Sequence, residues 1–181
     1  CNSNNSSVYA KITRNLSKFY NIRDDFVESL DKHMEQYFAF EMCDPDKEYE
    51  KFCLLNKFNE ERNFNCEYIG HLYKYNICSF KFIFDIFKRV YDMFMENIEK
   101  ENMRPVCELQ SGILKTLIIP IWKKQVKNDE LVEAVKMISS ISLKGTRTYP
   151  SYSNKSKFNL MDIDDFIQEY SSTDTSSSDS E

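Results

Sequence analysis

The 181-residue chain contains only three glycines and four prolines, which are residues that most tight turns require. All-β domains join many short strands through such turns, so this scarcity argues against them. Apolar side chains instead recur at intervals of three and four residues, the spacing of amphipathic helices. Hydrophobic residues make up 41% of the chain and aromatic residues 14%, which is enough to form a core. The sequence therefore predicts an all-α domain.

The clearest helix follows Ser79, a residue suited to cap it, and its buried side is expected to contain Ile83, Ile86, Phe87, Val90 and Phe94. Weaker patterns predict helices over residues 8–20, 24–40, 63–75, 105–120 and 129–145, with a charged linker at 43–51. Pro120 is expected to end or kink its helix, and Gly145 to stop the last one in the left-handed conformation. Helices in antiparallel pairs suggest stacked hairpins of the HEAT type, although no sequence repeat is visible.

The C-terminal segment differs in composition from the rest of the chain. No basic residue follows Lys157, whereas seven acidic residues do, and the remainder has 24 basic and 22 acidic residues. The predicted boundary therefore separates a domain at 8–158 from an acidic Ser/Asp-rich tail at 159–181 that is largely disordered. One short amphipathic run remains in this tail, formed by Leu160, Ile163, Phe166 and Ile167. The tail is either a solubilising extension or a segment that folds back over the basic stretches of the body.

The residues for catalysis or metal binding are sparse. No two of the six cysteines lie within four residues of each other, so no CxxC pair for zinc or redox chemistry occurs, and free thiols in a reducing compartment are expected. His33 and His71 are the only histidines, and no phosphate-binding loop or HExxH motif is present. No apolar run of 18 residues occurs. We therefore expect a non-enzymatic chain without cofactor, metal or membrane partner.

Two basic stretches, residues 109–128 and 134–161, contain no acidic residue. Lysine and arginine attract phosphate, and interleaved aromatic rings are able to stack on unpaired bases. The candidate RNA-binding residues are Lys115, Lys123, Lys124, Lys127, Lys144, Arg147 and Tyr149. The alternative is that these side chains belong to a solvated helix end and loop whose aromatic residues are packed.

Three segments, taken in order, resemble the middle domain of eukaryotic translation initiation factor 4 gamma. Residues 8–17 are similar to that family's opening helix, with Tyr-Ala-x-hydrophobic followed by Leu-Ser. Residues 68–74 are similar to its Phe-Ile-Gly-Glu-Leu signature, with Tyr68 for Phe and His71 for Glu. Residues 141–150 resemble its Asp-Leu-Arg turn, with Ser142 for Asp and Tyr149 where tryptophan is usual.

The resemblance implies a HEAT-type solenoid that acts as a cytoplasmic scaffold in translation initiation, docks a DEAD-box RNA helicase of the factor 4A type and binds RNA. The second segment also occurs in scaffolds of nonsense-mediated decay and RNA processing, so such a scaffold is the alternative. Five residues of these segments are interpreted as core: Tyr9, Leu16, Ile69, Leu72 and Leu143.

Residues 49–55 contain the pattern Tyr-x-x-x-x-Leu-hydrophobic, which is similar to the motif by which relatives of this factor bind the cap-binding subunit. A cap-binding subunit is therefore a further candidate partner. The other interpretation is that Tyr49, Phe52 and Leu55 hold a short helix against the body, and the position of the pattern inside the domain favours it.

Overall fold

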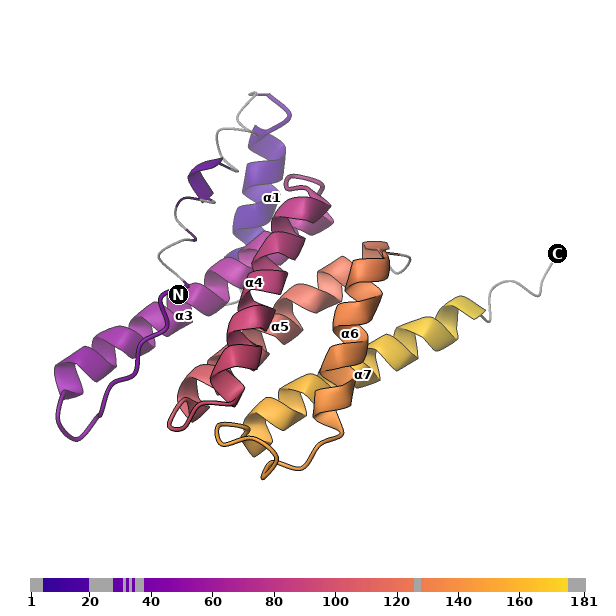
Figure 1. Cartoon of the computed structure of the whole chain (residues 1–181). Helices are drawn as coiled ribbons and strands as arrows, with labels where there is room; N and C mark the ends of the chain where they lie inside the picture. The colour runs from indigo at the N-terminus through magenta and orange to yellow at the C-terminus, as the bar shows by residue number, and fades with distance from the viewer. Residues whose placement is uncertain are drawn as a thin grey trace. The chain divides into compact units, whose positions relative to one another are not determined.

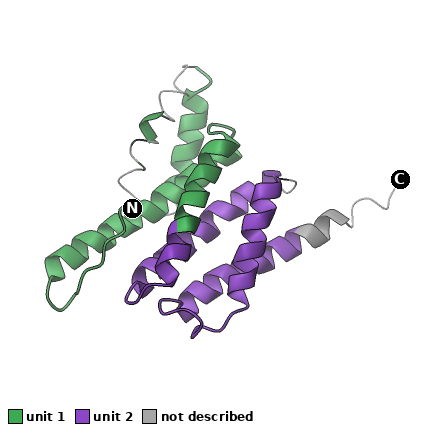
Figure 2. Ribbon diagram, in the orientation of Figure 1, with its two compact units in different colours: residues 1–92 green, residues 93–181 purple. Residues whose placement is uncertain are grey.

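A computed structural model describes residues 5–19, 28–30, 32, 34, 38–125 and 128–175, with the last five residues described by their backbone alone. The helices are α1 (Ser6–Leu16), α3 (Tyr49–Lys74), α4 (Phe80–Ile98), α5 (Arg104–Gln125), α6 (Asp129–Ser142) and α7 (Asn154–Thr175) (Figure 1). No strand occurs in these ranges, so the all-α class is confirmed. The helix predicted over 24–40 lies largely outside the described residues. The chain forms two compact units, residues 1–92 and 93–181 (Figure 2).

In unit 1, α1 packs against α3, and α3 is much longer than the sequence predicts. It begins at Tyr49, so the charged segment predicted as a linker already contributes to its first turn. Asn76 ends the helix in the left-handed conformation, with φ of 59°, and the Ile77 amide donates to the Leu72 carbonyl at 2.9 Å. This is the Schellman arrangement, in which asparagine replaces the more usual glycine.

The predicted core residues of α1 are exposed. Tyr9 and Leu16 are 52% and 45% exposed, so interpreting them as core was wrong. Ile12, at the same helical spacing, is 49% exposed. The side of α1 that faces α3 is formed by small residues instead: Ser6 and Ala10 are buried there. Periodicity identifies an amphipathic helix, but it does not identify which side of the helix meets a neighbour.

The predicted α4 pattern is confirmed. Ser79 Oγ accepts a hydrogen bond from the Phe82 amide at 3.2 Å, as an N-terminal cap does. All five predicted apolar residues, Ile83, Ile86, Phe87, Val90 and Phe94, are buried. Sequence periodicity was sufficient here because burial involves a single continuous side of the helix.

Two helix ends in unit 2 differ from the prediction. Helix α5 continues through Pro120 to Gln125, so Pro120 does not end the helix, although proline lacks the amide hydrogen. The flanking side chains of Ile118, Ile121 and Trp122 are buried, and this burial offsets the lost hydrogen bond. Helix α6 ends at Ser142, and Gly145 does not adopt the predicted left-handed conformation.

The segment from residue 159, predicted as a disordered tail, forms most of α7 up to Thr175. Leu160 and Ile163 are completely buried, and α7 packs against both α5 and α6. The boundary placed after residue 158 therefore falls inside a helix. The acidic composition of this segment suggested a tail. Its apolar residues at helical spacing instead pack α7 against α5 and α6. Residues 176–181 lie outside the described residues.

Candidate nucleic-acid interface

The connection between α6 and α7 brings two predicted RNA-binding residues into contact. The Lys144 ammonium donates to the Tyr149 hydroxyl at 2.7 Å and lies 5.0 Å from the centre of its ring. Lys157, in the first turn of α7, donates to the Lys144 carbonyl at 3.1 Å. Arg147 lies between these residues in the sequence and is exposed. We call Lys144, Arg147, Tyr149, Lys157 and Phe158 the α6–α7 corner.

Phe158 is the more exposed of the two aromatic residues in this corner. Its side chain is 61% exposed, whereas Tyr149 is half-buried and has the Lys144 ammonium over its ring. Leu143, interpreted as core from the sequence, is 85% exposed, so that interpretation was wrong. It caps α6 in a right-handed conformation beyond the last buried turn. The exposed apolar side chains of Leu143 and Phe158 thus lie next in sequence to Lys144 and Lys157.

Half-buried and buried polar groups join α6, α7 and their connection next to the corner. The Asp164 carboxylate of α7 accepts hydrogen bonds from the hydroxyls of Ser139 and Ser142 on α6. The Tyr152 hydroxyl donates to the Ile141 carbonyl at 3.1 Å. Burial, and next the nearby Asp164 charge, raises the pKa of Tyr152 to about 12. These contacts hold the loop in place and put the Asp164 charge near Tyr152.

The other predicted residues belong to α5. Lys115 forms an ion pair with Asp162 of α7 at 2.5 Å. The Lys123 ammonium lies 5.5 Å from the centre of the Phe166 ring, and the Tyr170 hydroxyl donates to the Lys123 carbonyl at 3.3 Å. Lys124 is exposed in the last turn of α5, and Lys127 lies outside the described residues. Acidic and aromatic residues of α7 therefore cover part of the basic side of α5.

The structure separates the predicted residues into two groups. Lys123 and Lys124 precede α6, whereas the α6–α7 corner follows it. Helix α6, which contains 14 residues and is roughly 20 Å long, lies between the two groups in the chain. Lys157 and Phe158, which complete the corner, were not among the predicted site residues. The sequence showed only that both residues belong to the second basic stretch. It did not show that Lys157 contacts the Lys144 carbonyl, because this contact forms when α7 folds back toward the end of α6.

The pattern at residues 49–55 occupies the first two turns of α3. Tyr49 and Leu54 are 70% and 69% exposed, whereas Phe52 and Leu55 are half-buried. The interpretation that Tyr49 packs against the body was therefore wrong. Leu54 and Leu55 also line a groove of about 490 Å³ between α3 and the preceding segment, together with Phe58 and Lys51.

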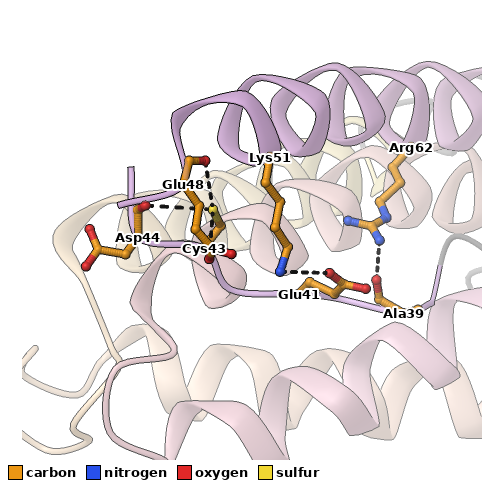
Figure 3. A network of polar contacts seen from close by, with 7 residues as sticks. All are labelled: Ala39, Glu41, Cys43, Asp44, Glu48, Lys51 and Arg62. Atoms are coloured by element: carbon orange, nitrogen blue, oxygen red, sulfur yellow. Dashed lines mark hydrogen bonds and ion pairs between the residues drawn. The ribbon is translucent and has the colours of Figure 1, made fainter. Parts of the chain in front are cut away.

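Contacts of unit 1 hold that preceding segment along α3 (Figure 3). The Arg62 guanidinium is 1% exposed, donates to the Ala39 carbonyl and lies 4.7 and 4.5 Å from the ring centres of Phe40 and Phe58. Lys51 lies 3.9 Å from Glu41.

Other chemistries have little support in the described part of the chain. No three His, Cys, Asp or Glu side chains are grouped to hold a metal ion there. His71 is half-buried in α3, and burial, followed by the charge of Lys74, lowers its pKa. His33 lies outside the described residues. None of the described helices is both long and apolar enough to cross a membrane.

The chain matches no protein-family model, no curated protein sequence and no solved structure.

Proposed function

We propose that this chain is a scaffold domain of translation initiation that binds RNA and docks a DEAD-box RNA helicase of the factor 4A type. Its helices would form a HEAT-type solenoid acting in the cytoplasm. Such a scaffold acts by favouring one arrangement of the helicase lobes rather than by chemistry of its own. The sequence resemblance over residues 8–150 motivates the helicase, and the α6–α7 corner is the observation that carries RNA binding.

The corner suits single-stranded RNA for two physical reasons. Lys144, Arg147 and Lys157 present cationic groups that attract phosphate, and their attraction weakens as salt is raised. The exposed ring of Phe158 offers a surface on which an unpaired base is able to stack. Neither interaction reads base identity, so the proposed binding is sequence-tolerant.

The RNA test uses a fluorescently labelled oligouridylate and the whole chain. Reversing Lys144 and Lys157 to Glu is expected to weaken binding at least tenfold at low salt, by removing phosphate contacts. Lys136→Glu is the control for charge reversal, because Lys136 is an exposed lysine that lies on α6 outside the corner. Equal affinity of the wild type and the double variant would remove the corner from the proposal.

The helicase test measures ATP turnover by a purified factor 4A-type helicase in the presence of RNA. The chain is expected to raise this turnover while showing none alone. Failure to bind or stimulate would exclude the initiation scaffold. Binding to a different DEAD-box protein would instead support the alternative, a scaffold of nonsense-mediated decay or RNA processing.

The exposure of Tyr49 and Leu54 supports the cap-binding subunit as a further partner. Both side chains project from one helix and are available to a second protein, as the similar motif requires. Replacing both by Ala is expected to abolish capture by the immobilised subunit. Retained capture would show that Tyr49 and Leu54 do not bind the cap-binding subunit.

A further inference from the structure

Helix α1 and the turn that follows it carry a row of large apolar side chains that are about half exposed or more. Val8, Ile12, Leu16 and Phe19, here called the α1 stripe, are 50%, 49%, 45% and 80% exposed. Their separations of four, four and three residues place them along one side of the helix and its final turn. Contiguous apolar surface of this kind marks interaction sites rather than ordinary solvent-facing surface.

The opposite side of α1 holds the stripe in this outward position. Ala10 is completely buried against α3, and the Ser6 hydroxyl donates to the Glu67 carboxylate at 3.3 Å. The Thr13 and Tyr68 hydroxyls are 2.7 Å apart and share a hydrogen bond. The small residues of α1 pack against α3. A rotation of α1 that buried its large residues would therefore break these contacts.

The charged residues of α1 and of the turn that follows it are all basic. Lys11, Arg14 and Lys18 are exposed, and residues 5–19 contain no aspartate or glutamate. The Arg14 guanidinium lies 5.2 Å from the centre of the Tyr75 ring, which keeps this charge at the end of α3. By helical geometry, Lys11 and Lys18 border the stripe on one edge and α3 borders it on the other. A second copy of α1 would bring like charges together, so the complementary surface is acidic.

We propose that the α1 stripe is a docking site for an amphipathic helix whose apolar side is edged by Asp and Glu. A row of side chains at spacings of three and four forms a ridge that fits the groove of another helix. Acidic residues along one border of that helix would pair with Lys11 and Lys18. An anionic membrane is a weaker fit, because basic residues border only one edge of the stripe. This site is separate from the α6–α7 corner and does not depend on RNA binding.

The test measures fluorescence anisotropy of a labelled amphipathic peptide with leucines at helical spacing, edged by glutamates. We expect the whole chain to bind this peptide. If lysines replace the glutamates of the peptide, we expect the affinity to fall at least tenfold. A scrambled peptide of the glutamate composition is expected not to bind. Equal binding of the scrambled peptide would overturn the proposal, since charge alone would then explain the affinity.

Two variants locate the site. Ile12→Gln with Leu16→Gln is expected to weaken glutamate-peptide binding about tenfold, with helicity unchanged because both side chains are already about half exposed. Met137→Gln is the matched control: Met137 is 43% exposed on α6, and its replacement is expected to leave affinity within about twofold. An equal loss in both variants would overturn the assignment to α1.

Charge reversal distinguishes the partner classes. Lys11→Glu with Lys18→Glu is expected to exchange the peptide preference, so that the lysine peptide binds more tightly than the glutamate peptide. Binding to vesicles of phosphatidylcholine and phosphatidylserine without binding to the peptide would overturn the proposal of a helical partner and indicate a membrane surface instead. If the molar mass of the wild type in solution doubles as its concentration is raised, and that of the Ile12/Leu16 variant does not, the stripe would instead bind a second copy of this chain.

Discussion

The Lys115 ammonium lies 2.5 Å from the Asp162 carboxylate, and this ion pair joins α5 to α7. The two side chains are 37% and 50% exposed, so water screens the pair and its contribution is small, about 1 kcal/mol or less. Buried apolar residues therefore carry most of the attachment of α7. The acidic segment is part of unit 2, and its charge gives a local contact with the basic side of α5.

Shortening a buried side chain of α7 tests this attachment. Leu160→Ala is expected to reduce the free energy of unfolding by about 2–5 kcal/mol, because it leaves a cavity at a fully buried position. Met161→Ala, at the next and exposed position, is expected to cost about 0.5 kcal/mol or less. Urea unfolding followed by circular dichroism measures both. Similar small losses would mean that α7 contributes little to the core.

RNA length separates the two basic groups. Since α6, roughly 20 Å long, lies between the end of α5 and the α6–α7 corner in the chain, we expect a very short oligouridylate to reach only one of them. Reversing Lys144 and Lys157 is expected to weaken short and long RNA alike. Reversing Lys123, Lys124 and Lys127 to Glu is expected to weaken only RNA long enough to span α6. A loss of short-RNA binding in the second variant would place the primary contact at α5.

Arg62 is expected to control access to the segment before α3. Arg62→Lys removes the planar group that lies against Phe40 and Phe58 and donates to the Ala39 carbonyl, at a cost of about 1–3 kcal/mol. Trypsin is then expected to cleave after Lys47 faster than in the wild type. Cleavage after Lys136, an exposed lysine of unit 2, serves as the internal control. Unchanged cleavage after Lys47 would show that other contacts hold the segment.

The cysteines are expected to differ sharply in reactivity. Burial raises the pKa of Cys66 and of Cys107 to about 12, so their thiolate fraction at neutral pH is very small. Cys53 is exposed. Brief treatment with iodoacetamide followed by peptide mass spectrometry is expected to modify Cys53 and to spare Cys66 and Cys107 until the chain is unfolded. Rapid native modification of Cys66 would indicate that α3 opens locally.

Tyr152 is expected to contribute to alkaline unfolding. Its pKa rises from 10.0 to about 12 on folding, so the folded chain retains a proton that the unfolded chain loses. The associated stability is complete below pH 10 and is lost as the pH rises toward about 12. Tyr152→Phe removes the ionisable group, so the loss of stability over this range is expected to be shallower. Parallel curves for the two proteins would mean that Tyr152 does not ionise in this range.

The sequence alone determined the helices whose buried side is continuous. Ile83 to Phe94 of α4 and Leu131 to Ile141 of α6 repeat at helical spacing, and their burial follows from that pattern. The scarcity of turn residues likewise determined the all-α class. Lys144 and Tyr149 were identified as neighbouring candidates because they share one basic, aromatic stretch.

Tertiary structure decided what periodicity cannot encode, namely which side of a helix meets a partner. The small side of α1 packs against α3, so Ile12 and Leu16 remain exposed despite their helical spacing. Packing of α7 on α5 and α6 buries Leu160 inside a segment whose composition predicted a tail. The contact of Lys157 with the Lys144 carbonyl joins α7 to the loop that follows α6. Such outcomes depend on shape and on the free energy of burial between distant segments, which a local pattern does not contain.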